Sequence, residues 1–152
     1  MKKSDKVLDR KHIMELLPHR DPFLHIDRIV DYKLGESIIA EKKVNPDESY
    51  FKGHFPGQPI LPGVIIIEAM AQAGGVLGHL TVGDIKPKPI YYLVGVEKAR
   101  FRFPVLPGNH LRIEVNVDRI IKGMWRYKCN ATVNEKVSVD AIIMCAPSDI
   151  KL

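Results

Sequence analysis

The chain has 152 residues, of which 45% are hydrophobic and 27% charged. These values are ordinary for a single globular domain spanning residues 1–152, and they exclude a largely disordered chain. A net charge of +5 favours an acidic partner. Aromatic residues make up only 7%, and no Arg-rich helix or zinc-finger spacing occurs, so we do not expect nucleic acid to be that partner.

The two cysteines, Cys129 and Cys145, have no C-x-x-C spacing and no histidines at metal-ligand offsets around them. We therefore predict neither a disulfide nor a zinc site, and expect two buried thiols in a reducing compartment. The charged N-terminus is followed by no apolar signal-peptide core, and the apolar segment 64–80 is interrupted by Glu68, Gln72 and glycines. The sequence thus predicts a cytoplasmic protein that does not insert into a membrane.

The first half of the chain predicts a short helix followed by a hairpin. Apolar residues from Ile13 to Leu17 stop at Pro18, as they would in a short helix. Residues 23–33 and 36–44 are typical of two strands joined at Gly35.

Alternating patterns dominate the second half. Leu111, Ile113, Val115 and Val117 alternate with polar residues, which indicates a strand with one buried face. The same period recurs over residues 125–133 and 137–141. Turns at 122–123 and 134–136 join these strands into an antiparallel meander.

A helix of unusual composition is predicted between the two groups of strands, from Gly63 to Leu80. Its three polar residues, Glu68, Gln72 and His79, fall on one narrow stripe at about 100° per residue. A helix that is apolar on every other side must be enclosed by protein. We therefore predict an α+β hotdog fold, in which about six antiparallel strands form one curved sheet around the helix and a second subunit covers the rest.

A rigid loop precedes this helix and carries His54. Pro56, Pro59 and Pro62 lie three residues apart with glycines between them, which restricts the backbone. Gly63 follows Pro62 and opens the helix, so unpaired N–H groups and the positive end of the helix dipole lie at this corner. A developing negative charge would be stabilised there.

Glu68 and His54 have the properties of an acid and a base. Glu68 lies in the apolar run 64–70, where loss of hydration should raise the carboxyl pKa. Histidine is a base near neutral pH. Structural roles remain open at this point, because a histidine in a Pro-rich turn is often a hydrogen-bonded loop residue and a lone glutamate often pairs with arginine or faces a subunit interface.

The motif GHFPGQPILPG, followed by IEAMAQ, closely resembles the signature of the bacterial (3R)-hydroxyacyl-acyl carrier protein dehydratases of the FabZ type. LPHRDPFLHIDRI, ARFRFPVLPGN and IIMCA also resemble the family's pattern in the family's order, so the resemblance covers nearly the whole chain.

The resemblance implies roles for particular residues. His54 and Glu68 would be catalytic, and the N–H of Gly63 would bind the thioester oxygen. Phe55, Pro62 and Gln72 would contribute to the oxyanion and substrate site. No metal and no organic cofactor is implied. The family pairs two subunits so that the histidine of one faces the glutamate of the other, and three such dimers often form a hexamer.

Three residues depart from the family's usual pattern, namely His25, Leu61 and Phe103. The first two are expected to be packing changes, and Phe103 would alter the rim where a carrier protein docks. Nearby, the alternation over 98–103 places Lys98, Arg100 and Arg102 on one face of a strand. That face is either a solvated surface or a docking patch for acidic acyl carrier protein.

Two other functions compete with dehydration. A hotdog thioesterase would hydrolyse the same class of bond, although its usual pattern lacks GHFP before the helix. A non-catalytic acyl-carrier-binding module would hold the acyl chain without reacting, although retention of both His54 and Glu68 argues against it.

Overall fold

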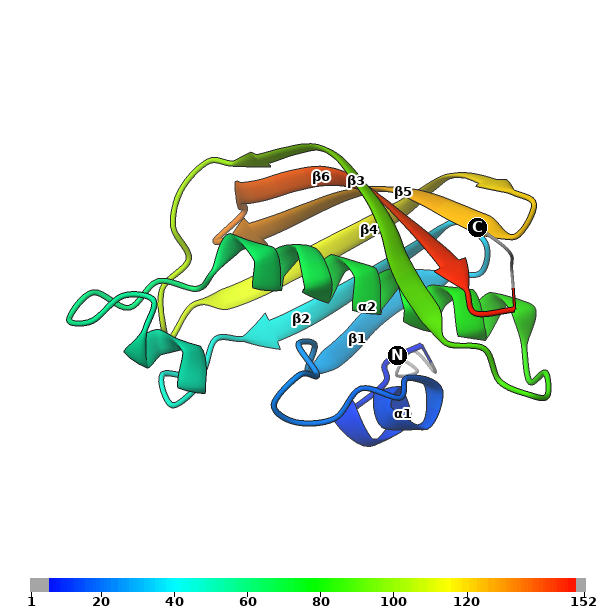
Figure 1. The fold of residues 1–152 in the computed structure, drawn as a ribbon, viewed down its shortest axis with the longest axis horizontal. Helices are drawn as coiled ribbons and strands as arrows, with labels where there is room; N and C mark the ends of the chain where they lie inside the picture. Colours follow the sequence, from blue (N-terminus) through cyan, green and yellow to red (C-terminus); the bar gives the residue numbers. More distant parts are fainter. Residues whose placement is uncertain (1–5, 150–152) are drawn as a thin grey trace, which may run out of the picture.

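The computed structural model describes residues 6–149 and shows one curved antiparallel sheet wrapped around a long helix (Figure 1). The sheet has six strands in the order β1-β2-β4-β5-β6-β3. This architecture confirms the predicted hotdog fold. The elements in chain order are α1 (Arg10–Leu16), β1 (Arg28–Lys33), β2 (Ser37–Lys43), the 3-10 helix η1 (Ser49–Lys52), α2 (Gly63–Val82), β3 (Tyr91–Phe101), β4 (His110–Ile121), β5 (Met124–Val133) and β6 (Lys136–Pro147).

Two tight turns set the register of the β4–β5–β6 meander. Lys122 and Gly123 connect β4 to β5 with φ of 51° and 82°, and Asn134 and Glu135 connect β5 to β6 with φ of 49° and 67°. Positive φ at both central residues is what a two-residue hairpin needs to match the twist of its strands. Both turns lie where the sequence predicted them.

Glycines on α2 allow aromatic side chains of the sheet to approach the helix closely. The Tyr127 hydroxyl donates a hydrogen bond of 2.8 Å to the carbonyl of Gly74. A Cβ on Gly74 would lie 2.8 Å from the Tyr127 ring, and one on Gly78 would lie 2.7 Å from the Tyr91 ring. The glycines in the centre of α2 are therefore explained by packing.

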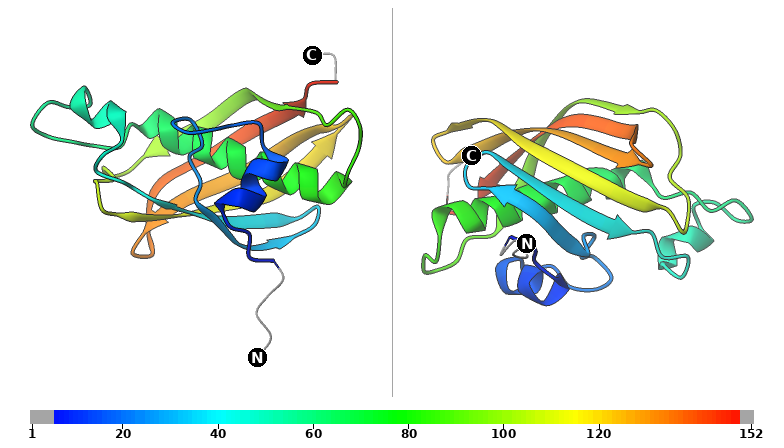
Figure 2. Two further views of the ribbon diagram at one scale, coloured as in Figure 1. Left: turned by 90° about the horizontal axis from the view of Figure 1, so that it is seen from below. Right: turned by 180° about the vertical axis from the view of Figure 1, so that it is seen from behind.

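By length and composition alone, α2 could cross a membrane, with a mean hydropathy of 1.4 over its most apolar window. However, 72% of that window is buried inside the fold. Figure 2 shows in two further views that the sheet lies along one side of this helix. These are the properties of a core helix, as the sequence predicted.

The prediction of a strand over residues 23–33 was wrong for its first part, since β1 begins only at Arg28. The backbone groups of residues 23 and 25 form hydrogen bonds with a side chain and not with a neighbouring strand. Gln72 of α2 accepts a bond from the His25 N–H at 2.8 Å and donates one to the Phe23 carbonyl at 2.9 Å. The segment therefore lies against the helix.

The strict alternation predicted over residues 98–103 was also wrong. In the pairing of β3 with β6, Glu97 lies opposite Ile142 and Arg100 opposite Asp140, so β3 carries one extra residue there. Lys98 lies in this bulge with φ of 51°. Because a bulge reverses the in-out pattern, Lys98 and Arg100 do not share a regular strand face.

The two edges of the sheet differ in how they are covered. At β1, Leu8 and Ile29 exchange backbone hydrogen bonds of 3.0 and 2.9 Å, so the N-terminal segment covers part of that edge. Within residues 6–149, no segment pairs with the outer edge of β3. An uncovered edge strand offers unpaired N–H and C=O groups to another chain.

Replacing Gly74 with alanine is expected to destabilise the fold, because Tyr127 is fully buried and the added Cβ would lie only 2.8 Å from its ring. Overpacking typically costs about 1–3 kcal/mol, and better helix propensity returns up to about 1 kcal/mol. Urea denaturation should show a net loss of about 1–2 kcal/mol in the free energy of unfolding. Gly53→Ala is the control, since no atom lies within 4 Å of its added Cβ. An equal loss in both variants would contradict this account.

Candidate active site

His54 is held by short backbone contacts on both sides. On the N-terminal side, the Tyr50 carbonyl in η1 accepts hydrogen bonds from Gly53 N at 3.2 Å and His54 N at 2.9 Å. On the C-terminal side, Ile60 N donates to the His54 carbonyl at 3.0 Å. These bonds close the loop 54–60 on itself.

The same loop orients the His54 imidazole. Nδ1 lies 2.8 Å from the Ile60 carbonyl, which can only accept a hydrogen bond. In the neutral ring Nδ1 therefore carries the proton, and Nε2 keeps a lone pair. Nε2 is the nitrogen that can act as a base.

The His54 cleft has a volume of about 500 Å³ and contains the beginning of α2. Gly63 is the first residue of that helix, and its N–H has no acceptor within the described residues. The Phe101 ring covers the Cα of Gly63 so closely that an added Cβ would lie 2.6 Å from Cδ1. Any larger residue at position 63 would force the Phe101 ring to move. The lining residues are His54, Ile60, Leu61, Gly63, Val64, Ile66, Phe101, Arg102, Phe103, Pro104, Val105 and Val139.

Phe55 and Pro62 lie beside this cleft. The Phe55 ring stacks on the His54 ring with centroids 4.0 Å apart, and 48% of Phe55 is exposed. Pro62 is the residue before α2, and its carbonyl accepts a hydrogen bond from Ile65 N. The first residue supports the imidazole, and the second fixes the start of the helix.

Glu68 lies one and a half turns into α2 and is partly buried. Burial raises the pKa of its carboxyl, and a hydrogen bond from Gln72 offsets part of that rise. Gln72 Nε2 lies 3.3 Å from Glu68 Oε2. Because Gln72 is 2% exposed and also bonds Phe23 and His25, it holds the carboxyl in place.

A second cavity, of about 320 Å³, surrounds Glu68. Tyr91 and Tyr92 line it. His19 also lines it. The lining residues are Leu17, Pro18, His19, Glu68, Ala71, Gln72, Ile90, Tyr91, Tyr92 and Leu93.

Within residues 6–149, the two cavities have no lining residue in common. One chain by itself therefore does not bring His54 and Glu68 to the same void. The His54 cleft lies at the Phe101 end of β3, and the Glu68 cavity lies at the Tyr91 end.

The three basic residues near the His54 cleft are all exposed but have different surroundings. Arg102 lines the cleft and forms a 2.7 Å ion pair with Asp140. Lys98 and Arg100 lie further along β3 and have no ion pair with the described residues. Arg102 is thus partly neutralised, while the other two present unpaired positive charge.

Within residues 6–149, no group of three histidine, cysteine, aspartate or glutamate side chains could hold a metal ion. Cys129 and Cys145 are buried free thiols, as predicted.

The chain belongs to the FabA-like family, whose domain model matches residues 17–142. Individual proteins are also similar to this chain along nearly its whole length. The chain is 46% identical to the 3-hydroxyacyl-(acyl-carrier-protein) dehydratase FabZ of Escherichia coli O9:H4, over 97% of this chain and 98% of that protein. Identity and coverage are the same for the FabZ of Salmonella arizonae.

Solved structures show the same fold at low sequence identity. A chain of the dehydratase heterocomplex ApeI:P from Xenorhabdus doucetiae has a TM-score of 0.77 and 18% identity, over 90% of this chain and 91% of that one. Cj0977, a sigma28-regulated virulence protein from Campylobacter jejuni, has a TM-score of 0.66 and 15% identity, over 92% and 89%.

The raised pKa of Glu68 predicts how stability depends on pH. A carboxyl with a higher pKa in the folded state favours folding at low pH, and this stabilisation is lost as the pH rises through the folded pKa. Glu68→Gln keeps a neutral group of the same shape. We expect its stability relative to the wild type to increase as the pH rises above about 4.3, the usual value for glutamate.

Urea denaturation between pH 4 and pH 8, at one protein concentration, measures this difference. Glu135→Gln, in the exposed β5–β6 turn, controls for the loss of one carboxyl. If the difference in free energy of unfolding between Glu68→Gln and the wild type did not change with pH, the conclusion that burial raises the Glu68 pKa would be ruled out.

Proposed function

We propose that the protein dehydrates (3R)-hydroxyacyl-acyl carrier protein to the trans-2-enoyl product, as a hydro-lyase of fatty acid synthesis. One observation carries the proposal. An imidazole with a free Nε2 and a carboxyl with a raised pKa lie in cavities at opposite ends of the same uncovered edge strand. The family membership and the identity to FabZ relatives support the substrate class.

A two-fold axis through β3 would unite the two cavities. The strand spans Tyr91–Phe101, so its centre is Val96. Two copies related by such an axis pair antiparallel, which brings Phe101 of one subunit opposite Tyr91 of the partner subunit. His54 of one chain would then face Glu68 of the other, and the homodimer would hold two identical sites.

Exposed apolar residues support this interface. Along β3, Leu93 is 37% exposed, Val96 45% and Phe101 55%, and at the start of α2 Val64 is 71% exposed. Side chains of this kind on one edge favour burial against another subunit. Assembly of three such dimers into a hexamer remains a prediction of the family resemblance.

The proposed reaction uses this chain's own groups. His54 Nε2 takes the proton from C2 of the 3-hydroxyacyl thioester, and the Gly63 N–H stabilises the oxyanion that develops on the thioester oxygen. The C3–O bond breaks as the C2 electron pair forms the double bond. Glu68 gives its proton to the departing hydroxyl, which leaves as water. The proton held by His54 then returns to Glu68 through water.

A complementation experiment tests both the residues and the shared site. We expect His54→Ala and Glu68→Gln each to lower kcat by at least about 10³-fold, measured by enoyl absorbance with a (3R)-hydroxyacyl carrier substrate. Mixing the two inactive variants with exchange of subunits should restore about one quarter of the wild-type activity, because half of the dimers are mixed and one of their two sites is intact.

A mixture as inactive as its components would show that the two residues do not act across subunits. Full activity in either single variant would remove that residue from the mechanism. Release of free thiol without enoyl absorbance would instead identify a thioesterase.

We further propose that Lys98 and Arg100 dock the acidic carrier protein beside the cleft, with Arg102 held by Asp140 at its rim. The positive net charge of the chain is consistent with such a partner. We place the reaction in the cytoplasm, where fatty acid synthesis would supply the carrier substrate.

Arg100→Glu is expected to raise KM for the carrier substrate about tenfold, because it puts a negative charge against an acidic partner. Adding salt should weaken wild-type binding and narrow this difference. A hydroxyacyl thioester of a small thiol should react equally with both proteins. Arg112→Glu, on β4 and three strands away from β3, is the matched control. A KM that does not respond to either salt or Arg100→Glu would argue against docking here.

A further inference from the structure

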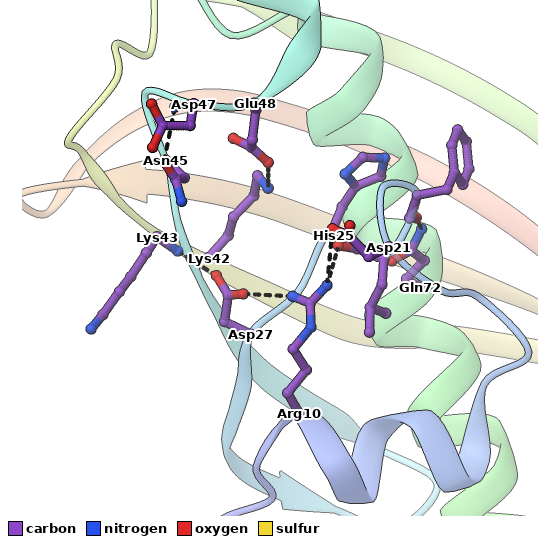
Figure 3. Close-up of polar contacts among 12 residues, drawn as sticks. Arg10, Asp21, His25, Asp27, Lys42, Lys43, Asn45, Asp47, Glu48 and Gln72 are labelled. Carbon is purple, nitrogen blue, oxygen red and sulfur yellow. Dashed lines mark hydrogen bonds and ion pairs between the residues drawn. The ribbon is translucent and has the colours of Figure 1, made fainter.

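A buried lysine lies on the inner face of β2. Lys42 follows Ile38 and Ala40 at a period of two, which places its side chain on the same face as theirs, and it is 3% exposed. Its ammonium donates a 2.8 Å hydrogen bond to Glu48 Oε1 (Figure 3). A buried ammonium is costly unless a carboxylate compensates it. The two side chains are therefore strongly coupled.

Glu48 connects this lysine to the segment that carries His54. It immediately precedes η1, and its carbonyl accepts a hydrogen bond from Phe51 N. Its side chain makes no capping bond to η1 and reaches to Lys42 on β2 instead. The carbonyl of Tyr50, within η1, accepts the His54 N–H. The ion pair thus ties the base of the His54 loop to the sheet.

The other polar groups nearby do not replace this tie. Both ring nitrogens of His25 are buried and have no hydrogen-bond partner within residues 6–149. The Tyr50 hydroxyl lies near Glu48, and burial together with this carboxylate raises the pKa of Tyr50, but Tyr50 belongs to η1 itself and gives no link to the sheet. Burial lowers the pKa of His25 to about 4, so its ring is neutral near neutral pH and does not compete with Lys42 for the carboxylate. The bond from Lys42 is therefore the link between the Glu48 side chain and β2.

We propose that the Lys42–Glu48 ion pair is a positioning element for the proposed dehydration. It ties η1 to the inner face of β2 and so sets the place from which the His54 imidazole reaches the substrate. The inference rests on the proposed function. Neither residue lines the His54 cleft or the Glu68 cavity, so the pair acts through His54. Small displacements of a catalytic group have large effects, with about 1 Å costing on the order of 10²-fold in rate.

Removing the two charges in two stages distinguishes an effect of the ion pair on the position of His54 from an effect on the stability of the fold. Lys42→Met removes the ammonium, leaves the partly buried Glu48 without its ion-pair partner, and should lower both thermal stability and kcat. Lys42→Met/Glu48→Gln removes both charges and should recover most of the stability. In this double variant we expect kcat to remain about 10- to 100-fold below the wild type, with KM changed less than about twofold.

Arg28→Met/Glu41→Gln is the matched control, because it removes an exposed ion pair of 3.1 Å between β1 and β2. Its kcat should equal that of the wild type. A Lys42→Met/Glu48→Gln variant that regains both stability and wild-type kcat would show that the buried pair only stabilises the fold. An equal loss of kcat in the control would also overturn the proposal. Wild-type protein that forms no enoyl product would overturn the proposed function itself, and the positioning role with it.

Subunit mixing locates the defect. The double variant keeps Glu68 intact, so mixing it with Glu68→Gln should recover up to about one quarter of wild-type activity, as for His54→Ala. Mixing the double variant with His54→Ala should give no activity beyond that of the double variant itself. In the mixed dimer, the one site that retains both His54 and Glu68 then uses the displaced His54. If activity returned in the mixture with His54→Ala, or in neither mixture, the defect would not be confined to the half-site that contributes His54.

Discussion

Enclosure of α2 is the constraint on which the structure depends. The helix is apolar on almost every side, and most of its residues from Ile66 to His79 are buried. One sheet can cover it only by curving around it, and the small residues at 74 and 78 let tyrosines of that sheet come close enough to do so. The same enclosure removes water from Glu68 and raises its pKa. The close packing of α2 and the raised pKa of Glu68 therefore have the same cause.

The helix also explains why the proposed site needs two chains. Its first amide, at Gly63, and its carboxyl, at Glu68, are separated by about 7.5 Å along the axis and by roughly 140° around it. They consequently face different cavities of one chain. A two-fold axis beside the helix would turn these two half-sites into two whole ones without any change in the fold.

Much of the fold followed from local patterns. The alternation from Leu111 to Val117 predicted β4, and the composition of residues 63–80 predicted the enclosed helix. The failures had non-local causes. Residues 23–27 look like a strand, but the backbone groups of Phe23 and His25 hydrogen-bond to the side chain of Gln72, almost 50 residues later. The bulge at Lys98 is set by pairing with β6, and the side-chain pattern of β3 does not reveal it.

For the site, the sequence predicted both candidate catalytic residues, since a histidine in a rigid loop and an acid in an apolar run are local features. The Lys42–Glu48 pair was missed, although a signal was present. Lys42 falls on the buried face by its spacing from Ile38 and Ala40, and a charged residue at such a position needs a partner. The identity of that partner depends on how η1 packs against β2, which spacing alone does not give.

The uncovered edge of β3 has a consequence for the amount of protein present. If the proposed site is built from two chains, a lone subunit would be inactive and not merely a slower catalyst. Where the dimer is partly dissociated, the concentration of active sites would then rise with the square of the free subunit concentration. The strand that closes the sheet would therefore also couple activity to expression level.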